Sequence, residues 1–321
     1  MDVLRFRTKL ATGLATAALL AVPVFGQANT SSDTQTHGQA VVTVLPDKNA
    51  QPREVSAQDL QVRINGKDAT ITNVQSLRSN SDRLEVVLMM DAGARTSLSN
   101  QFGDIKNFIN GLPADAKVTL AYMQFGTARV VSPLTTDRNA VLKGLRIPAG
   151  SPGENASAYV CLSDLAKHWP SQDRSARRVV VMITDGVDYY NPQYDSQDPY
   201  METAISDSVR SGLVVYSIYW QNKGRFDRTW YANNAGQNLL AQVTQATGGN
   251  SYWEGMGNPV SFQPFFKDLD RRLQNQYEVA FTAPVSKPGV ESMKLKVNNG
   301  GVKVDAPQQV YVGRGTTGGA M

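Results

Sequence analysis

The sequence has few of the residues that form disulfide bonds in small secreted domains or act as nucleophile and base in catalysis. Its 321 residues include one cysteine, Cys161, and two histidines, His37 and His168. A lone cysteine excludes an internal disulfide, and with it the disulfide-stapled class of extracellular domain. No Gly-x-Ser-x-Gly elbow is present, and Cys161 shares a predicted helix face with Leu165, which favours a buried small hydrophobe over a nucleophile. We therefore predict a protein that is not an enzyme.

Charge is also sparse, and the two signs nearly balance. Charged residues make up 19% of the chain and hydrophobic residues 41%, which is ordinary for a soluble globular protein. The 32 basic and 28 acidic residues give a net charge of +4; without residues 1–26 they become 29 and 27, or +2. This composition lacks the concentrated basic face that nucleic-acid binding needs. We predict no nucleic-acid partner.

No apolar run is long enough to span a bilayer. The longest, over residues 10–25, follows three basic residues and contains a proline, and it is shorter than the roughly 20 residues that a membrane-spanning helix requires. A basic start, an apolar run and small residues after it are typical of a secretory signal. We predict a signal peptide at residues 1–26 and a flexible lead at 27–38. The mature protein would be periplasmic or secreted, with no membrane span.

Both ends of the chain show the two-residue period of antiparallel strands. Leu60, Val62 and Ile64 alternate with polar residues up to Asn65-Gly66, a hairpin turn signal. The same alternation returns near the C-terminus, over 277–282 and 293–297. Two separate three-stranded pieces would be marginal, so we expect one small antiparallel β-sandwich built from residues 39–80 and 277–313. A flexible tail is predicted at 314–321.

The middle of the chain has a different pattern, in which continuous apolar runs alternate with helical spacing. The runs lie at residues 84–90, 118–125, 179–183 and 213–220. Such runs suit strands that are covered on both faces of a mostly parallel sheet. Alternation of strand and helix over this length predicts a doubly wound α/β domain with a mostly parallel sheet at residues 82–276.

Two carboxylates follow two of these predicted strands. Asp91 ends the first apolar run, and Asp185 follows the run at 179–183. Ligands of open α/β sheets bind outside the carboxyl ends of the strands, so we expect both carboxylates at one edge. Close carboxylates need a cation, a shared proton or a basic partner. A hard divalent ion such as Mg²⁺ or Mn²⁺ is one answer. Arg95, whose guanidinium can bind a carboxylate through two hydrogen bonds, is another.

A strand ending in Asp91, then a helix, then VVVMITDG ending in Asp185 and Gly186 resembles the von Willebrand factor type A (VWA) domain. The flanks QVRINGKDATITNVQSL and QYEVAFTAPVSKPGVESMKLKV resemble those of exported bacterial, acidobacterial-type VWA-related proteins. The resemblance implies a VWA/Rossmann-like fold and a metal-ion-dependent adhesion site (MIDAS) at Asp91, Ser157 and Asp185. The family pattern Asp-x-Ser-x-Ser is broken by Gly93 and Arg95. The implied site is therefore degenerate, either holding Mg²⁺ or Mn²⁺ or being metal-free.

Aromatic and arginine residues concentrate in the two loops expected at this edge. Tyr, Trp and Arg dominate interface hot spots because they bring rigid contact area with a polar handle. We predict that a partner protein is bound by Arg95, Tyr189, Tyr190, Tyr194, Arg225, Phe226, Arg228, Trp230 and Tyr231. The alternative is that several of these rings pack down and close their own loops, with Trp220 the first candidate.

These observations predict an exported, non-catalytic adhesion or scaffold protein that recognises another protein through a MIDAS-like edge. A carbohydrate-binding module is the second interpretation, because flat aromatic rings beside Asp, Asn and Arg also suit sugar faces. A hydrolase is the third, although no nucleophile with a base in reach is evident in the sequence.

Overall fold

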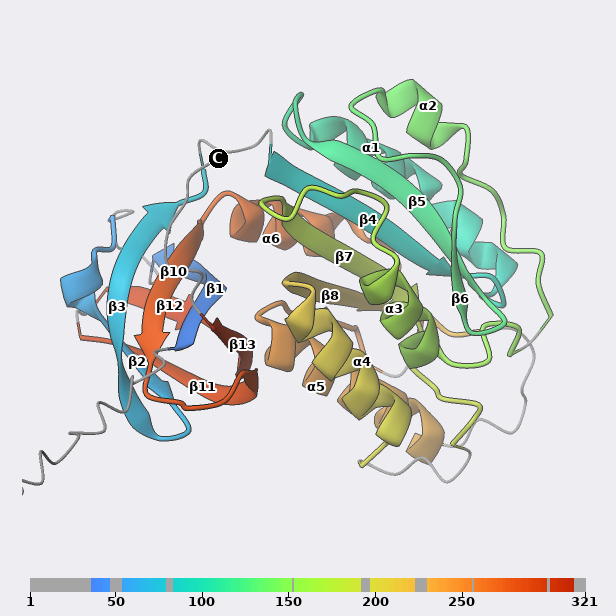
Figure 1. The fold of residues 1–321 in the computed structure, drawn as a ribbon. Coiled ribbons are helices and arrows are strands. Elements are labelled where there is room, and N and C mark those ends of the chain that lie inside the picture. Colours follow the sequence, from blue (N-terminus) through green and yellow to red (C-terminus); the bar gives the residue numbers. More distant parts are fainter. Residues whose placement is uncertain are drawn as a thin grey trace, which may run out of the picture. The chain divides into compact units, whose positions relative to one another are not determined.

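The computed structural model describes residues 36–46, 54–78, 83–151, 153–191, 197–222, 230–255, 257–298 and 301–314 (Figure 1). Trp230 is described as the first residue of a helix, without its side chain. The predicted signal peptide and residues 315–321 of the predicted tail lie outside the described residues. The first strand begins at Thr36, within the predicted flexible lead.

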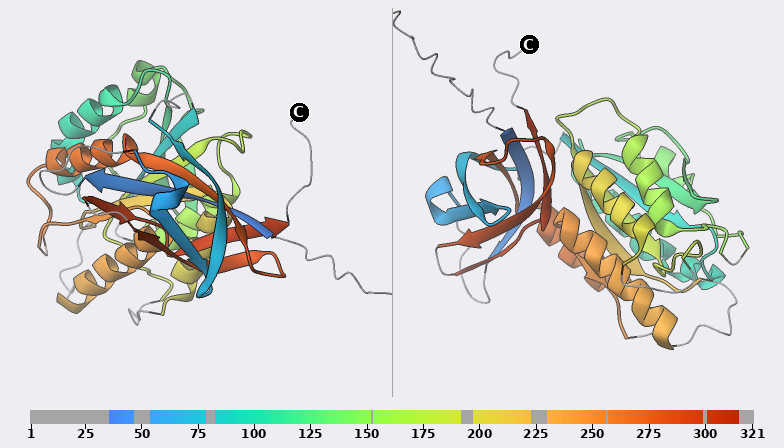
Figure 2. Two further views of the ribbon diagram at one scale, coloured as in Figure 1. Left: turned by 90° about the vertical axis from the view of Figure 1, so that its left-hand side faces the viewer. Right: turned by 60° about the horizontal axis from the view of Figure 1, so that its bottom comes forward.

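The strands from the two chain ends form one closed antiparallel barrel. Around the barrel the order is β10 (Gln276–Ala283), β3 (Lys67–Ser76), β2 (Leu60–Ile64), β11 (Gly289–Val297), β13 (Gln309–Arg314) and β1 (Thr36–Pro46). Closure comes from β1, which pairs with β13 on one side and with β10 on the other. The seventh strand of this sheet, β12 (Val302–Asp305), pairs with the C-terminal part of β1. Two further views show these strands curving around a common interior (Figure 2), which Val42, Val62 and Phe281 help to fill.

The predicted hairpin is present as β2 and β3. Its turn residues, Asn65 and Gly66, have φ values of +50° and +79°. Two consecutive residues at positive φ are what a tight two-residue hairpin turn requires, because that backbone twist matches the twist of the flanking strands. Asn65 also accepts hydrogen bonds from the backbone N–H and hydroxyl of Ser292, which fixes the turn against β11.

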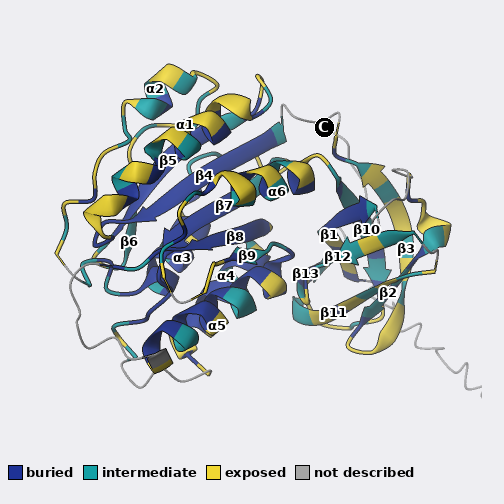
Figure 3. Ribbon diagram, turned by 180° about the vertical axis from the view of Figure 1, so that it is seen from behind, coloured by how far each residue is buried: buried dark blue, intermediate teal, exposed yellow. Residues whose placement is uncertain are grey.

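The middle of the chain forms a six-stranded mixed sheet. Its order is β6 (Thr127–Val130), β5 (Lys117–Gln124), β4 (Leu84–Asp91), β7 (Arg177–Thr184), β8 (Leu213–Tyr219) and β9 (Ser251–Tyr252). Neighbouring strands run parallel from β5 to β9, whereas β6 returns antiparallel to β5 through a hairpin. Strands β4 and β8 are buried at every residue (Figure 3), as their continuous apolar runs predict.

The two sheets correct the predicted fold class, a doubly wound, mostly parallel sheet beside a β-sandwich. The expected sandwich is wrong because β1 has neighbours on both of its edges, so the antiparallel sheet closes on itself instead of splitting into two layers. The other sheet is mixed, because the chain turns back at Phe125-Gly126 and adds β6 as an antiparallel edge. Closure was invisible in the sequence, since strand periodicity does not report which strands become neighbours.

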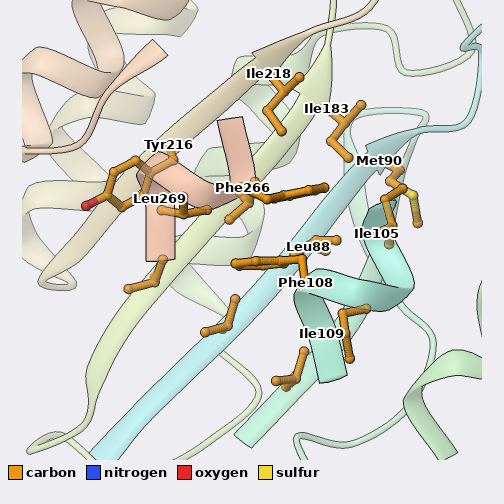
Figure 4. Packing of buried hydrophobic residues seen from close by; sticks show 14 of the residues in the cluster. Leu88, Met90, Ile105, Phe108, Ile109, Ile183, Tyr216, Ile218, Phe266 and Leu269 are labelled. Carbon is orange, nitrogen blue, oxygen red and sulfur yellow. The ribbon is translucent and has the colours of Figure 1, made fainter. Parts of the chain in front are cut away.

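Helices cover both faces of the mixed sheet. The helical elements are η1 (Ala57–Asp59), η3 (Thr96–Gln101), α1 (Phe102–Gly111), α2 (Arg138–Leu142), α3 (Ala158–Lys167), α4 (Pro199–Arg210), α5 (Trp230–Thr247) and α6 (Gln263–Leu273). Helices α1 and α6 pack against Val86, Leu88 and Met90, while α3, α4 and α5 pack against the alternate residues Val87 and Met89. Phe108 of α1 stacks on Phe266 of α6 with ring centroids 4.5 Å apart (Figure 4).

A buried arginine links α6 to the strands of the barrel. Arg272 donates to Asp268 over 2.7 Å and to Asp305 of β12 over 2.8 Å. Two carboxylates around one nearly buried guanidinium satisfy the charge that burial would otherwise make costly. Among the described residues, no helix has the length and apolarity that crossing a bilayer would require.

Candidate functional site

Asp91, at the carboxyl end of β4, is the centre of a buried polar cluster. Its Oδ1 accepts from the Gly93 N–H at 2.8 Å. Its Oδ2 accepts from three side chains, namely Asn155 Nδ2 at 2.7 Å, Asn222 Nδ2 at 2.8 Å and Thr184 Oγ1 at 3.1 Å. Thr184 ends β7, Asn222 follows β8 and Asn155 lies in the loop that precedes α3, so the cluster joins the ends of β4, β7 and β8 to that loop.

Asp185 lies at the same edge and is joined to Asp91 through Asn222. Asp185 Oδ1 accepts from the Val187 N–H at 3.0 Å, and Oδ2 accepts from the backbone N–H of Asn222 at 3.3 Å. Asn222 therefore donates to both carboxylates, one through its backbone and the other through its side chain. The structure thus brings together the two acidic residues that the sequence places 94 positions apart.

The hydrogen bonds described for the Asp91 carboxylate come from neutral donors. Arg95 is exposed, and its Nε donates to the backbone oxygen of Asn222 at 3.1 Å. Its guanidinium thus contacts Asn222, the residue that donates to both carboxylates. The hypothesis that Arg95 takes the place of an ion stays a prediction. Several hydrogen bonds to an ionised carboxylate stabilise it without a counter-charge. A role for Arg95 in partner binding stays a prediction.

The backbone at Gly93 leaves no room for the serine of the family pattern. A Cβ atom at this position would lie 2.8 Å from the carbonyl oxygen of Ser151 and 3.4 Å from Gly153 N. The loop before α3 thus closes over the space in which the first MIDAS serine would sit. Real Cβ atoms do not approach a backbone oxygen this closely, so the glycine is a requirement of the fold.

The residues at this edge do not fit a divalent ion as they are placed. Both Asp91 oxygens face N–H and O–H hydrogens, which repel a cation. The Oδ1 atoms of Asn155 and Asn222 are buried without a partner among the described residues, but both amides would have to turn over to present them to the same space. The described residues also hold no cluster of three or more His, Cys, Asp or Glu with metal-binding geometry.

Ser157 caps helix α3 and hydrogen-bonds Asp188, which lies near a second carboxylate, Asp198. Its Oγ accepts from the N–H groups of Tyr159 and Val160 at 3.2 and 3.3 Å, which makes it the N-cap of α3. It also hydrogen-bonds Asp188, which is buried. The pKa of Asp188 is raised to about 6, mainly by burial and in addition by the nearby Asp198 carboxylate, while hydrogen bonds from Tyr190 and Ser157 oppose the shift. The hydrogen bond described from this loop to Asp91 is the one that Asn155 donates.

The aromatic and arginine residues of the two predicted loops fall into three groups. Tyr190 and Tyr231 are 52% and 57% exposed, and Tyr189 is half-buried where its ring packs over Gly153. Trp220 is buried, with its ring edge-on to Phe262, so it packs down as the alternative interpretation proposed. The side chain of Trp230 and four whole residues lie outside the described part of the chain: Tyr194, Arg225, Phe226 and Arg228.

Phe125 is an exposed aromatic residue at this edge that sequence reasoning assigned to a buried strand. It begins the turn between β5 and β6, where its side chain is 67% exposed and its φ is +50°. Non-glycine residues seldom adopt this left-handed conformation. A Cβ at the neighbouring Gly126 would lie 3.7 Å from the Tyr190 hydroxyl, and the Tyr190 ring centroid is 5.5 Å from that of Tyr200. Tyr190 and Tyr200 thus form an exposed aromatic pair beside the turn that carries the exposed Phe125, and we refer to the three residues as the aromatic patch.

Three members of the Asp91 cluster were missed in the sequence, namely Asn155, Thr184 and Asn222. A signal existed for two of them, because Thr184 immediately precedes Asp185 and Asn222 follows the end of β8 at the same edge. The rule that ligands gather at strand ends would have included both. Asn155 carried no such signal, because it comes from a loop of irregular sequence.

No protein-family model matches the chain, and a search of curated proteins finds no match. Solved structures do show similarity. An aerotolerance-related membrane protein from Bacteroides fragilis is 16% identical, with 59% of this chain and 98% of that chain covered and a TM-score of 0.40. The VWA domain of SpRpn10 is 12% identical, with 58% and 93% covered and a TM-score of 0.36. The pilus adhesin SpaC from Lactobacillus rhamnosus GG is 10% identical, with 84% and 48% covered and a TM-score of 0.43.

VWA domains are thus among the structures similar to this chain, as the sequence resemblance implied. TM-scores below 0.5 at these identities establish neither a function nor a family. The narrower acidobacterial-type family has no support among these structures and stays a prediction.

Proposed function

We propose that this protein is an exported, non-catalytic recognition protein that binds a partner protein at the carboxyl edge of the mixed sheet. The observation that carries the proposal is the aromatic patch of Phe125, Tyr190 and Tyr200, which stands exposed beside the buried Asp91 cluster. Large apolar rings held in water are disfavoured unless a partner covers them, and exposed aromatics with polar handles are the usual anchors of interfaces.

The buried cluster supports this proposal by making the edge rigid. Asp91 and Asn222 tie together segments that would otherwise end as independent loops. A preordered surface loses less conformational entropy on binding. In this proposal the carboxylates therefore fix the positions of the loops that form the recognition surface. The aromatic patch and Arg95 contact the partner.

A crosslinking pull-down from native cell-envelope extract tests the proposal. We expect Phe125→Ser with Tyr190→Ala to reduce capture of the partner by roughly tenfold or more, because hot-spot aromatics contribute at least about 1–2 kcal/mol each. Arg95→Glu should also weaken capture. The matched control is Tyr311→Ala, which removes an exposed ring from β13 of the barrel. Equal capture by all variants would refute recognition at this edge.

A glycan array separates the protein-recognition proposal from carbohydrate binding. The exposed rings of Tyr190 and Tyr200 are the feature that favours a sugar ligand, because sugar faces stack on such rings. Glycan binding that is lost in Tyr190→Ala, together with unchanged capture of proteins, would assign the patch to carbohydrate.

A further inference from the structure

An unusual group of arginines gathers at the opposite edge of the mixed sheet, where the parallel strands begin. A pocket of about 370 Å³ lies there, between the C-terminal ends of α3 and α4 and the start of β7. Arg174, Arg178 and Arg210 line it together with Lys167, and none of its described lining residues is acidic. A pocket of this volume is within the range that holds small organic ligands.

Each of the three guanidinium groups lacks an ion-pair partner within 4.0 Å among the described residues. Arg178 donates to the backbone oxygens of Asp173 and Ser211 at 3.0 and 3.5 Å, while its buried Nε has no partner. Arg210 donates weakly to Ser206 Oγ, at 3.4 Å, and its guanidinium lies over the Tyr311 ring, 5.5 Å from the ring centroid. Lys167 differs, because its ammonium pairs with Asp207 over 2.9 Å.

Arg174 and Arg178 also repel each other. Burial lowers the pKa of Arg178, and the like charge of Arg174 adds to that effect, while Glu85 and Asp173 oppose it. Glu85 is itself engaged, since it accepts from the Trp169 indole at 2.7 Å and from Ser171 Oγ at 2.8 Å. An anion bound between two like charges relieves their repulsion.

A simpler explanation accounts for part of this charge. Lys167 and Arg210 lie in the last turns of α3 and α4, where basic side chains interact favourably with the negative end of the helix dipole. That explanation does not extend to Arg174 and Arg178, which lie before and at the start of a strand.

A smaller adjoining pocket, of about 150 Å³, shares Arg174 and adds Arg83 and Arg177, but Glu278 also lines it. The larger pocket is therefore the better anion site.

We propose that this pocket binds a tetrahedral oxyanion, as a phosphate or sulfate monoester, between Arg174, Arg178 and Arg210. Planar guanidinium groups present paired N–H donors that match two oxygens of such a group. The volume beyond the oxyanion leaves room for the organic part of the ester. This site is independent of the recognition proposed at the carboxyl edge, because it lies at the other ends of the same strands.

Calorimetric titration of the full chain at low ionic strength tests the proposal, with inorganic phosphate, inorganic sulfate and O-phosphoserine as separate probes. We expect binding that weakens as salt is added. Arg174→Gln and Arg178→Gln should each reduce affinity roughly tenfold or more, because a hydrogen bond to a charged group is lost. Tighter binding of phosphoserine than of phosphate would show that the pocket holds the organic part. Equal binding would show that it recognises the oxyanion alone.

Controls keep this test decisive. Arg63→Gln removes an equal charge from β2 of the barrel, where Arg63 pairs with Asp68 at 2.8 Å. Arg174 is exposed and has no described ion-pair partner, so Arg174→Gln is expected to fold even if Arg178→Gln does not. Absence of binding by all three probes would overturn the proposal. So would retention of full affinity in Arg174→Gln, or an equal loss in Arg63→Gln.

Discussion

Asn222 donates its side-chain N–H to Asp91 across 2.8 Å, and this hydrogen bond joins the segment after β8 to the end of β4. The same residue donates its backbone N–H to Asp185. A single amide side chain thus connects the ends of non-adjacent strands through a buried carboxylate.

Asn222→Ala should destabilise the protein by about 2 kcal/mol, because it withdraws a donor from a buried charged acceptor. Urea denaturation followed by tryptophan fluorescence measures this change. The matched control is Asn139→Ala on α2, where the side chain is exposed and the cost should stay within about 0.5 kcal/mol. Similar midpoints for the two variants would contradict the role given to Asn222.

Gly93→Ser, which restores a residue of the MIDAS pattern, should lower stability and create no metal site. The new Cβ would press on the Ser151 carbonyl oxygen, and such overpacking costs roughly 1–3 kcal/mol. Thermal unfolding with and without Mg²⁺ gives both results in one experiment. Gly103→Ser on α1 is the control, because a Cβ there meets nothing within 4 Å. A Mg²⁺-dependent rise in the melting temperature of Gly93→Ser would overturn the interpretation that the site is closed.

Asp188→Asn should stabilise the protein in a pH-dependent way. Burial raises the folded-state pKa of Asp188 to about 6, so between about pH 4 and pH 6 the folded state holds a proton that the unfolded state has released. The wild-type protein therefore loses stability as the pH rises through this window, and the asparagine variant does not. Above pH 7 the gain should be about 1–2 kcal/mol after allowance for solvent screening.

Denaturation midpoints of Asp188→Asn and wild type at pH 4, 5, 6 and 7.5 measure this difference. The two proteins should converge at pH 4 and separate towards pH 7.5. Asp270→Asn, at a half-buried position on α6, removes an equal charge and serves as the control for the loss of one carboxylate. A constant difference at every pH would mean that Asp188 titrates normally.

Cys161 should be unreactive towards thiol reagents in the folded protein. Its side chain is buried in α3, and burial raises the pKa of the thiol well above its usual value, so little thiolate forms. We expect negligible reaction with a disulfide reagent at pH 8, and one equivalent of reaction in urea. Rapid labelling without denaturant would show that α3 opens readily.

Much of the local structure could be predicted from residue patterns alone. Alternation at Leu60, Val62 and Ile64 with Asn65-Gly66 specified the hairpin, because turn chemistry and period act within a few residues. Strand ends also placed Asp91 and Asp185 at one edge. These features depend on short-range rules that a sequence displays directly.

Features that depend on distant pairing could not be obtained in the same way. The barrel closes through register between Thr36 and Ala283, residues that no local pattern relates. The exclusion of a serine at position 93 comes from the loop at Ser151, which approaches only in the folded chain. The neutral donors around Asp91 were missed for the same reason, since Asn155 and Asn222 reach it from loops whose geometry periodicity does not encode.

The closed barrel also sets an order for biogenesis. Strand β1 precedes the mixed sheet in the chain, and its neighbours β10 and β13 are the first and last strands of the segment that follows that sheet. The residues of β1 therefore have neither neighbour available until β10 has been synthesised. The intervening sheet has all its strands much earlier and can form first. A chaperone that binds extended segments during synthesis would therefore be expected to bind β1.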